Sequence, residues 1–400
     1  MTTSRRHPAR RRILIITAAV VGSVAVLAAV VVGAGGAFAP SRYLEPWAAD
    51  YHENFDDPRV QLVSVGLLAS SGHNMQPWLV RLDSDPNVFY LYADGSRLSP
   101  AVDPLARQVM VSQGTFLQFV TVAGQQLGHP VTVELFPDGD YDETEPQSSM
   151  ASTPVARVTL SSGASTSQPT WDSLFRSDTN RAPYTDAPLT EQQRGALADL
   201  DRDSEATLSI LIQRQDLDSL GKLAIEGSTI ESQSAAATVE SKAVFRSNEY
   251  LKNDSRWGFS VEGQGTTGAM KYLIQGLITL VPAMNSDDVG AQRQTDLTAA
   301  AVAATPAYGI ISTPANSRRH QVEAGMLYSR FDLTARSMGL VMQPLSQVIQ
   351  EYPAMAAPYA AVHDQYAPGG DTIQMIVRVG TPTVEYPQTM RRDVSDLILD

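Results

Sequence analysis

Nine consecutive residues, 70–78, combine side chains that could hold a planar polar ligand. The stretch reads Ser70-Ser71-Gly72-His73-Asn74-Met75-Gln76-Pro77-Trp78. Its hydroxyl and amide groups can offer hydrogen bonds to a polar ring, while the tryptophan can anchor the turn in the core. The flanking residues predict the end of an apolar helix at 67–69 and a strand at 79–82. A polar turn packed by one tryptophan explains the same residues without a ligand.

The spacing Ser-Ser-x-x-Asn-x-Gln-Pro-Trp resembles the flavin-contacting signature of the nitroreductase superfamily. The resemblance implies FMN as the cofactor. It also implies four residues at the edge of the flavin ring, namely Ser70, Ser71, Asn74 and Gln76. His73 is expected to pack or to form hydrogen bonds rather than to act as a general acid. No catalytic side chain is assigned, because the flavin itself carries the electrons.

A second stretch, residues 174–189, resembles the amino-terminal Arg-Arg-Ser-x-Arg segment of the same family, including the Tyr-Thr-Asp-x-Pro that leads into a helix. In that family the segment holds the flavin phosphate, and a guanidinium near a hydroxyl matches phosphate oxygens. By this resemblance Thr179 takes the place of the serine and Arg181 that of the last arginine. Asp178 stands where the family has an arginine. A polar loop capped before a helix at 190–200 is the alternative interpretation.

Each half of the chain carries one of these motifs and lacks the other. In ordinary nitroreductases two subunits build two flavin sites from facing elements of this kind. A single chain with one element in each half is therefore expected to form an internal pseudo-dimer that binds one flavin. The pattern resembles the Acg-type branch of the superfamily, whose members carry His-Asn-x-Gln-Pro-Trp and Thr-Asn-Arg. The resemblance covers roughly residues 60–385.

The same resemblance points to two later segments. Residues 339–345 follow a predicted helix, at the point where the backbone of nitroreductases lies beside the reactive nitrogen of the flavin ring. A backbone N–H of Gln343 or Leu345 is therefore expected to reach that nitrogen. Arg378, followed by Gly380, resembles the basic residue near the phosphate. Its apolar neighbours indicate an anionic partner, because a buried cation is otherwise costly. An ordinary arginine at the edge of a sheet is the alternative.

An internal repeat predicts the elements that position these residues. Residues 112–128 and 323–339 share an apolar helical pattern with glycines at the same separation, which helix capping explains. Each helix is preceded by a predicted strand and followed by another, at 88–93, 131–136, 308–313 and 372–379. We therefore expect an α+β fold, a nitroreductase-like unit duplicated within one chain and preceded by one transmembrane helix.

Low-complexity stretches at 138–150 and 161–169, with a predicted strand at 155–160 between them, separate the halves. The residues at 191–251 have no assigned role beyond that of a cover over the site. The expected divisions are a basic segment at 1–12, an anchor at 13–39, a polar tether at 40–59, a first half at 60–165, a second half at 166–385 and a C-terminal tail at 386–400.

Composition limits the classes of function. The chain has 400 residues, of which 43% are hydrophobic, enough for a large core, and its net charge of −13 argues against nucleic acid as a partner. The absence of cysteine excludes thiolate catalysis, iron–sulfur clusters and cysteine zinc sites. The six histidines stand far apart, so no metal site is expected.

The N-terminus is predicted to anchor the chain in the cell membrane. Five arginines precede an uncharged run at 13–39, which as a helix is about 40 Å long and can span a hydrocarbon core of about 30 Å. Residues 37–39, Ala-Phe-Ala, resemble a cleavage site, but Pro40 would follow the cut and disfavours it, so we expect a retained single-pass helix. The arginines belong on the cytoplasmic side, which places the soluble domain outside the cytoplasm. A weak resemblance of residues 10–14 to a twin-arginine export signal is an alternative explanation of the same arginines.

The resulting hypothesis is a membrane-anchored, monomeric flavoprotein in which FMN takes a hydride from NAD(P)H and reduces a small acceptor, a nitro compound or a quinone. The expected orientation opposes this reaction, because NAD(P)H is a cytoplasmic donor. Either the orientation is inverted, or the donor is a quinol or a protein, or no turnover occurs. Two alternative functions therefore remain. One is a protein that binds or sequesters flavin without turnover. The other is an anchored scaffold that has lost its cofactor, which the acidic residue at 178 favours.

Overall fold

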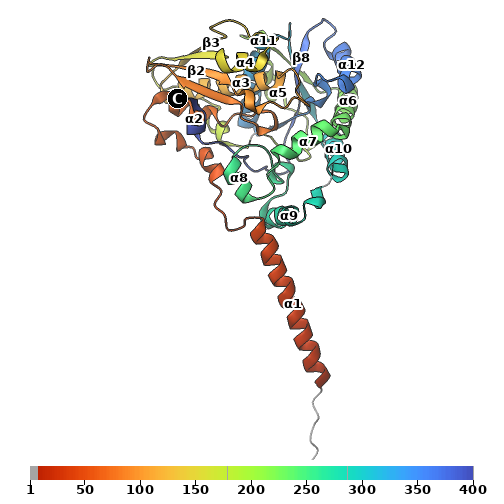
Figure 1. Cartoon of the computed structure of the whole chain (residues 1–400). Coiled ribbons are helices and arrows are strands. Elements are labelled where there is room, and N and C mark those ends of the chain that lie inside the picture. The colour runs from red at the N-terminus through yellow and green to blue at the C-terminus, as the bar shows by residue number, and fades with distance from the viewer. Residues whose placement is uncertain (1–7, 178, 286, 400) are drawn as a thin grey trace, which may run out of the picture.

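The computed structural model describes residues 8–177, 179–285 and 287–399, and it shows a long N-terminal helix that projects from a body of mixed helices and strands (Figure 1). The helices are α1 (Pro8–Ala34), α2 (Pro58–Gly66), α3 (Arg107–Leu127), α4 (Pro146–Ser152), α5 (Glu191–Ala198), α6 (Arg214–Gln233), α7 (Ala235–Val244), α8 (Glu249–Ser255), α9 (Gly268–Leu280), α10 (Asp287–Ala303), α11 (Arg318–Ser337) and α12 (Ala356–Tyr366). The strands are β1 (Trp78–Leu82), β2 (Val88–Ala93), β3 (Val131–Leu135), β4 (Ala156–Leu160), β5 (Thr207–Leu211), β6 (Ala307–Thr313), β7 (Val341–Pro344), β8 (Thr372–Gly380) and β9 (Ile398–Leu399).

The first half packs α3 against a sheet of strand order β3-β4-β2-β1-β9. Its pairs are antiparallel except for β1 and β9, which run parallel. Trp78 begins β1, is fully buried and lies near Phe116 of α3, with ring centroids 5.4 Å apart. The indole therefore anchors the polar turn in the core, as its type predicts. The four strands predicted in this half are confirmed to within one residue at either end.

The second half repeats this arrangement, with α11 on a sheet of order β5-β6-β8-β7. All three pairings are antiparallel. The central strands β6 and β8 are buried along almost their whole length, which explains why both are continuous apolar runs in the sequence. The strands predicted at 308–313 and 372–379 are confirmed, whereas β5 and β7 add the two edges.

The two halves meet along α3 and α11, and glycine permits the contact. A side chain on Gly114 would place its Cβ 1.9 Å from the carbonyl oxygen of Val322, and Gly325 occupies the reciprocal position against α3. Capping is therefore the wrong explanation for these two glycines, which allow close approach of the helices. It is correct for Gly128 and Gly339, whose φ angles of 80° and 75° end the helices in the left-handed region. The predicted duplication is thus an internal helix pair that carries a sheet on each outer side.

The expected tether and tail are packed parts of the body, which corrects both expectations. Tyr43 and Trp47 are 1% and 4% exposed. Arg391 is fully buried, with its guanidinium 4.5 Å from the centre of the Trp47 ring. Beyond it, β9 pairs with β1, and the carbonyl of Leu397 accepts the N–H of Val80 at 2.7 Å. The last residues of the chain therefore complete the sheet of the first half.

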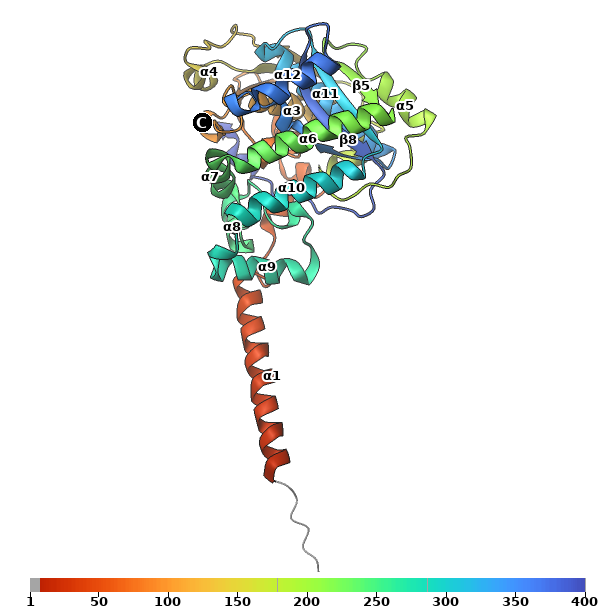
Figure 2. The same cartoon turned by 90° about the vertical axis from the view of Figure 1, so that its right-hand side faces the viewer.

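The helical stretch at 191–251 has a mixed role. Strand β5 belongs to the second sheet, whereas α6 packs along α10, α12 and the 3-10 turn at 346–349 (Figure 2). Helix α5 begins with a capping box formed by Thr190 and Gln193. The expected role of this stretch as a cover over the site stays a prediction.

Helix α1 stands apart from the body over most of its length (Figures 1 and 2). Its segment Ile15–Ala34 has a mean hydropathy of 2.7 and is long and apolar enough to cross a membrane, by length and composition. The side chains from Ile15 to Val30 are exposed, and contact with the body begins at Val31.

Candidate functional site

The polar turn between α2 and β1 has a strained backbone. His73, Asn74 and Gln76 have φ angles of 49°, 53° and 50°. Each such conformation in a non-glycine residue costs roughly 1–3 kcal/mol and persists only where the surroundings fix it. Here the Ser71 hydroxyl accepts the backbone N–H of Gln76 at 2.9 Å, and the Trp78 indole donates to a carbonyl of α3 at 2.7 Å. The turn is therefore held in a defined shape.

The amides of Asn74 and Gln76 bind the packed C-terminal segment. The Asn74 amide donates to the carbonyl of Met390 at 3.0 Å, and the Gln76 amide donates to that of Arg256 at 3.0 Å. The Gln76 amide oxygen accepts the backbone N–H of Arg392 at 2.9 Å. Both side chains are buried, and neither lines the cleft described next. The structure thus separates them from the two serines of the same motif.

A cleft of about 880 Å³, including its open mouth, brings the two sequence motifs together. Ser70 and Ser71 enter it from the first half, and Thr179 and Arg181 enter it from the second half. Its other lining residues are Gly72, His73, Gln108, Val111, Ser112, Thr115, Glu231, Tyr328, Pro344, Ser346, Gln347, Gln350 and Met375. Asp178 lies outside the described residues.

Three polar atoms in the cleft wall have no hydrogen-bond partner within the part of the chain that the structure describes. They are Oγ of Ser70 and Oε1 of both Gln347 and Gln350, and each is shielded from solvent. Buried polar atoms normally find partners, because leaving one unsatisfied costs about 1–3 kcal/mol. A ligand that offers hydrogen-bond donors, and an acceptor to the hydroxyl, would satisfy all three.

Among its described lining residues the cleft has one basic side chain, Arg181, and one acidic side chain, Glu231. Arg181 is exposed and donates to the carbonyl of Gly263 at 2.8 Å, which leaves further N–H donors for an anion. Glu231, from α6, accepts a hydrogen bond from the Gln350 amide. Burial raises the pKa of the Glu231 carboxyl, while hydrogen bonds from Gln350 and Gln347 act in the opposite direction. Burial, followed by the charge of Arg181, lowers the pKa of the His73 imidazole.

The three remaining predicted site residues do not line the cleft. The backbone N–H of Leu345 donates to the carbonyl of Ile376 at 2.8 Å, and the Leu345 side chain is buried. The side chain of Gln343 accepts the Nε–H of Arg378 at 2.6 Å. The segment nevertheless runs beside the cleft, because Pro344 contributes to its wall.

Arg378 is fully buried and holds the motif segment of the second half in place. Its guanidinium donates to the carbonyl of Ala182 at 2.6 Å and lies 3.8 Å from the centre of the Tyr184 ring. Carbonyl oxygens and an aromatic face thus take the role that an anionic partner was expected to fill. The position of Arg181 in the cleft depends on this support.

Several lining residues escaped the sequence analysis. Gln108, Ser112 and Thr115 form a polar row on α3 at helical spacing, and the predicted start of that helix at 112 hid the first of them. Ser346 and Gln347 directly follow the segment that was singled out. Glu231 had no local signal, because only the tertiary fold brings α6 to the cleft.

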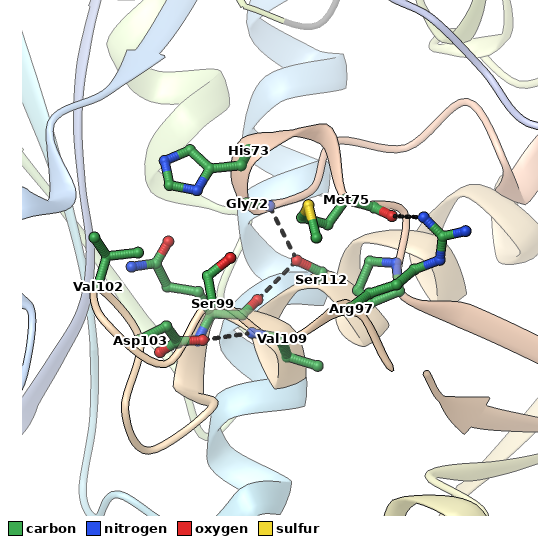
Figure 3. Close-up of a pocket in the computed structure, with 11 residues that line it drawn as sticks. Gly72, His73, Met75, Arg97, Ser99, Val102, Asp103, Val109 and Ser112 are labelled. Atoms are coloured by element: carbon green, nitrogen blue, oxygen red, sulfur yellow. Dashed lines mark hydrogen bonds between the residues drawn. The ribbon is translucent and has the colours of Figure 1, made fainter. Parts of the chain in front are cut away.

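A smaller pocket of about 300 Å³ lies behind the same turn and shares Gly72, His73, Gln108 and Ser112 with the cleft (Figure 3). Its two charged side chains already have partners. Asp103 accepts the backbone N–H of Val109 at 3.2 Å, and Arg97 donates to the Met75 carbonyl at 3.2 Å and pairs with Asp94 at 2.9 Å. These contacts fix the start of α3 and the turn, so we assign the pocket a structural role.

No protein-family model and no curated protein matches the sequence. Among solved structures, a nitroreductase with bound FMN from Desulfitobacterium hafniense is similar at 10% identity, over 59% of this chain and 99% of that chain, with a TM-score of 0.34. An FMN-dependent nitroreductase from Mycobacterium smegmatis, in complex with NADPH, is similar at 12% identity, over 55% of this chain and 92% of that chain, with a TM-score of 0.32.

A nitroreductase-like structure from Anabaena variabilis extends further along this chain. It covers 74% of this chain and 69% of its own, at 10% identity and a TM-score of 0.37. Identities this low concern the fold alone, and the resemblance to the Acg-type branch stays a prediction. These three solved structures, to which this α+β chain is similar, are described as nitroreductases.

Proposed function

We propose that this chain is a membrane-anchored flavoprotein that binds one FMN in the cleft between its halves. The observation that carries the proposal is the meeting of two motifs, one from each half, at a single cleft with unpartnered polar atoms in its wall. The residues present fit the group. FMN offers ring N–H and ribityl hydroxyl donors to the amide oxygens, and it offers acceptors to the Ser70 hydroxyl.

The proposed roles follow from the contacts. Ser70, Gln347 and Gln350 would bind the polar part of the flavin, while Thr179 and Arg181 would hold its phosphate. When bound, FMN supplies hydride acceptance and electron transfer. Gln343 remains a prediction for the backbone donor to the ring, whereas the N–H of Leu345 already has a partner in the second sheet.

Glu231 is the titratable group best placed to hold a proton beside a substrate, because burial favours its neutral form. Reduction of a nitro group or a quinone consumes protons as well as electrons. We therefore favour an oxidoreductase that acts on such acceptors. The expected extracytoplasmic side favours the second candidate, a flavin-binding protein without turnover.

Membrane anchoring is part of the proposal. The length and hydropathy of α1 support a single crossing of the cell membrane, with the N-terminal arginines in the cytoplasm.

The first test is flavin retention by the full chain in detergent. After incubation with FMN and desalting, the wild-type protein should keep a flavin absorption band. Ser70→Val should lose most of it, because it removes the unpartnered hydroxyl, whereas Ser167→Val, at an exposed position, should retain it. A folded wild-type protein that stays colourless would refute the proposal and favour the scaffold. If flavin is retained, oxidation of NAD(P)H with a nitroaromatic acceptor separates the enzyme from the binding protein.

A further inference from the structure

Helix α9 is amphipathic in the inverted sense, because its polar stripe faces the body of the protein. Lys271, Gln275 and Thr279 recur at every fourth position, which places them on one face. Lys271 forms an ion pair with Glu262 at 2.7 Å, and Gln275 is fully buried. Thr279 accepts the side-chain N–H of Asn248 at 3.1 Å. Lys271 and Thr279 thus bind partners within the protein, whereas the amide of Gln275 is enclosed without a hydrogen-bond partner among the described residues.

The opposite face of α9 and the 3-10 turn after it present large apolar side chains to the outside. Met270, Leu280, Val281 and Met284 are 54%, 49%, 47% and 53% exposed. A surface helix in water normally has the reverse arrangement, with polar residues outward. Large apolar side chains gathered on one exposed element mark a contact with something other than water.

The position of α9 identifies that contact. Both views show α9 at the base of the body, across the end of α1 (Figures 1 and 2). The helices touch through glycines: a Cβ on Gly276 would lie 1.8 Å from the carbonyl oxygen of Val31, and one on Gly35 would lie 2.1 Å from that of Tyr272. Such a contact fixes the level of α9 along α1.

The length of α1 below this contact matches the membrane. The uncharged run begins at residue 13, directly after the last arginine, and the body first covers the helix at Val31. At 1.5 Å per residue this distance is about 28 Å, close to the hydrocarbon thickness of about 30 Å. If α1 crosses a bilayer, α9 therefore lies at the outer boundary of its hydrocarbon core.

We propose that α9 and the turn at 282–285 lie in the interface of the bilayer that α1 crosses, with their apolar face among the lipids. The inference rests on the anchoring part of the proposed function. It adds a second, monotopic contact that seats the soluble body on the membrane surface and fixes which of its faces points outward.

Single-cysteine variants test this contact without interference, because the chain contains no cysteine. Leu280→Cys and Met284→Cys probe the surface, Val24→Cys probes the middle of α1, and Leu105→Cys is the control. Leu105 is 53% exposed. Its carbonyl accepts a hydrogen bond from Arg318, which in turn pairs with Glu143. Glu143 lies just before α4, at the end of the body remote from α1 (Figure 1). Each full-length variant is labelled with a fluorophore and placed in phosphatidylcholine bilayers that contain lipids with shallow or deep nitroxide quenchers.

We expect labels at 280 and 284 to be quenched at least threefold more by the shallow nitroxide than the label at 105. The label at 24 should respond most to the deep nitroxide. If 24 is quenched while 280 and 284 behave like 105, the anchor stands and the interfacial contact is refuted. If 24 is not quenched at all, membrane anchoring fails and the inference fails with it. Flavin retention by each variant reports separately on the cleft.

Discussion

At the scale of single residues, a variant of Gln76 tests whether this motif residue has a structural role or a ligand-binding role. Its side chain is fully buried and bonded to the backbone at Arg256, Met390 and Arg392. Gln76→Ala would leave buried backbone groups unsatisfied, so we expect a loss of about 3 kcal/mol in the free energy of unfolding. Denaturant titration measures this loss.

The matched control is Gln192→Ala, at an exposed position at the start of α5, where the change should stay below about 0.5 kcal/mol. A Gln76→Ala protein of unchanged stability that no longer binds flavin would contradict the structural role. It would restore the interpretation that the motif spacing alone suggests.

Arg181 allows phosphate recognition to be tested apart from ring recognition. As the one cation among the described cleft residues, it should contribute a charge-assisted hydrogen bond to the FMN phosphate. We expect Arg181→Gln to weaken FMN binding by roughly 10- to 100-fold while riboflavin affinity stays nearly constant. Fluorescence titrations with the two flavins measure both affinities, and an equal loss for the two would exclude a phosphate contact.

Glu231 should make stability depend on pH. Burial raises the pKa of its carboxyl in the folded protein above the unfolded value of about 4.3. The folded state therefore holds the proton more tightly, and this contribution to stability declines as pH rises through the folded-state pKa. Glu231→Gln removes the titration. Its amide can be accommodated, because Gln347 and Gln350 each have an oxygen that lacks a partner among the described residues.

The free energy of unfolding of Glu231→Gln relative to wild type should thus increase from pH 5 to pH 8. Denaturant titrations of both proteins at the two pH values provide the measurement. A difference that is constant with pH would show that the carboxyl has an ordinary pKa.

At the scale of elements, the contact of α3 with α11 depends on a missing side chain. Gly114→Ala would place a methyl group 1.9 Å from a backbone oxygen of α11, so the helices must separate. We expect a loss of at least about 2 kcal/mol by denaturant titration, despite the better helix propensity of alanine. Gly195→Ala in α5 is the control, because nothing lies within 4 Å of the new Cβ, and it should gain about 0.5–1 kcal/mol. Equal behaviour of the two variants would contradict the close crossing.

The central elements were predictable from sequence because their patterns are local. Buried strands β6 and β8 are apolar runs, and both long helices carry apolar faces. Their starts were not predicted: each helix begins five residues before its predicted start, with a polar residue, Arg107 or Arg318. These side chains bind other elements instead of solvent: Arg107 donates to the carbonyl of Gln374 at 2.6 Å.

In the candidate site, residue types identified the two motifs but not the directions of their side chains. The left-handed backbone at Asn74 and Gln76 turns the two amides toward a segment more than 300 positions later. No local pattern contains that partner. Ser70, Thr179 and Arg181 line the cleft, and their contact with a flavin stays a prediction. Glu231 reaches the cleft only through long-range packing.

At the scale of the whole molecule, the C-terminal segment stabilises the first half. Leu397 is fully buried in the core of that half, whereas Leu399 is 38% exposed. We expect Leu397→Ala to lower the free energy of unfolding by about 3 kcal/mol and Leu399→Ala by less than about 1 kcal/mol. Denaturant titration tests both. Equal, small effects would mean that the segment is the loose tail that its charged residues indicate.

The pairing of β9 with β1 also sets an order of events during synthesis. Strand β1 leaves the ribosome early, but its parallel neighbour is made at the very end of the chain. At 5–20 residues per second, translation of the intervening residues, about 300 of them, lasts roughly 15–60 s. Throughout that interval the edge of β1 stays open as a template for strands of other nascent chains. The sheet of the first half therefore cannot be completed until residues 398–399 are made, and its biogenesis depends on protection of one strand edge until then.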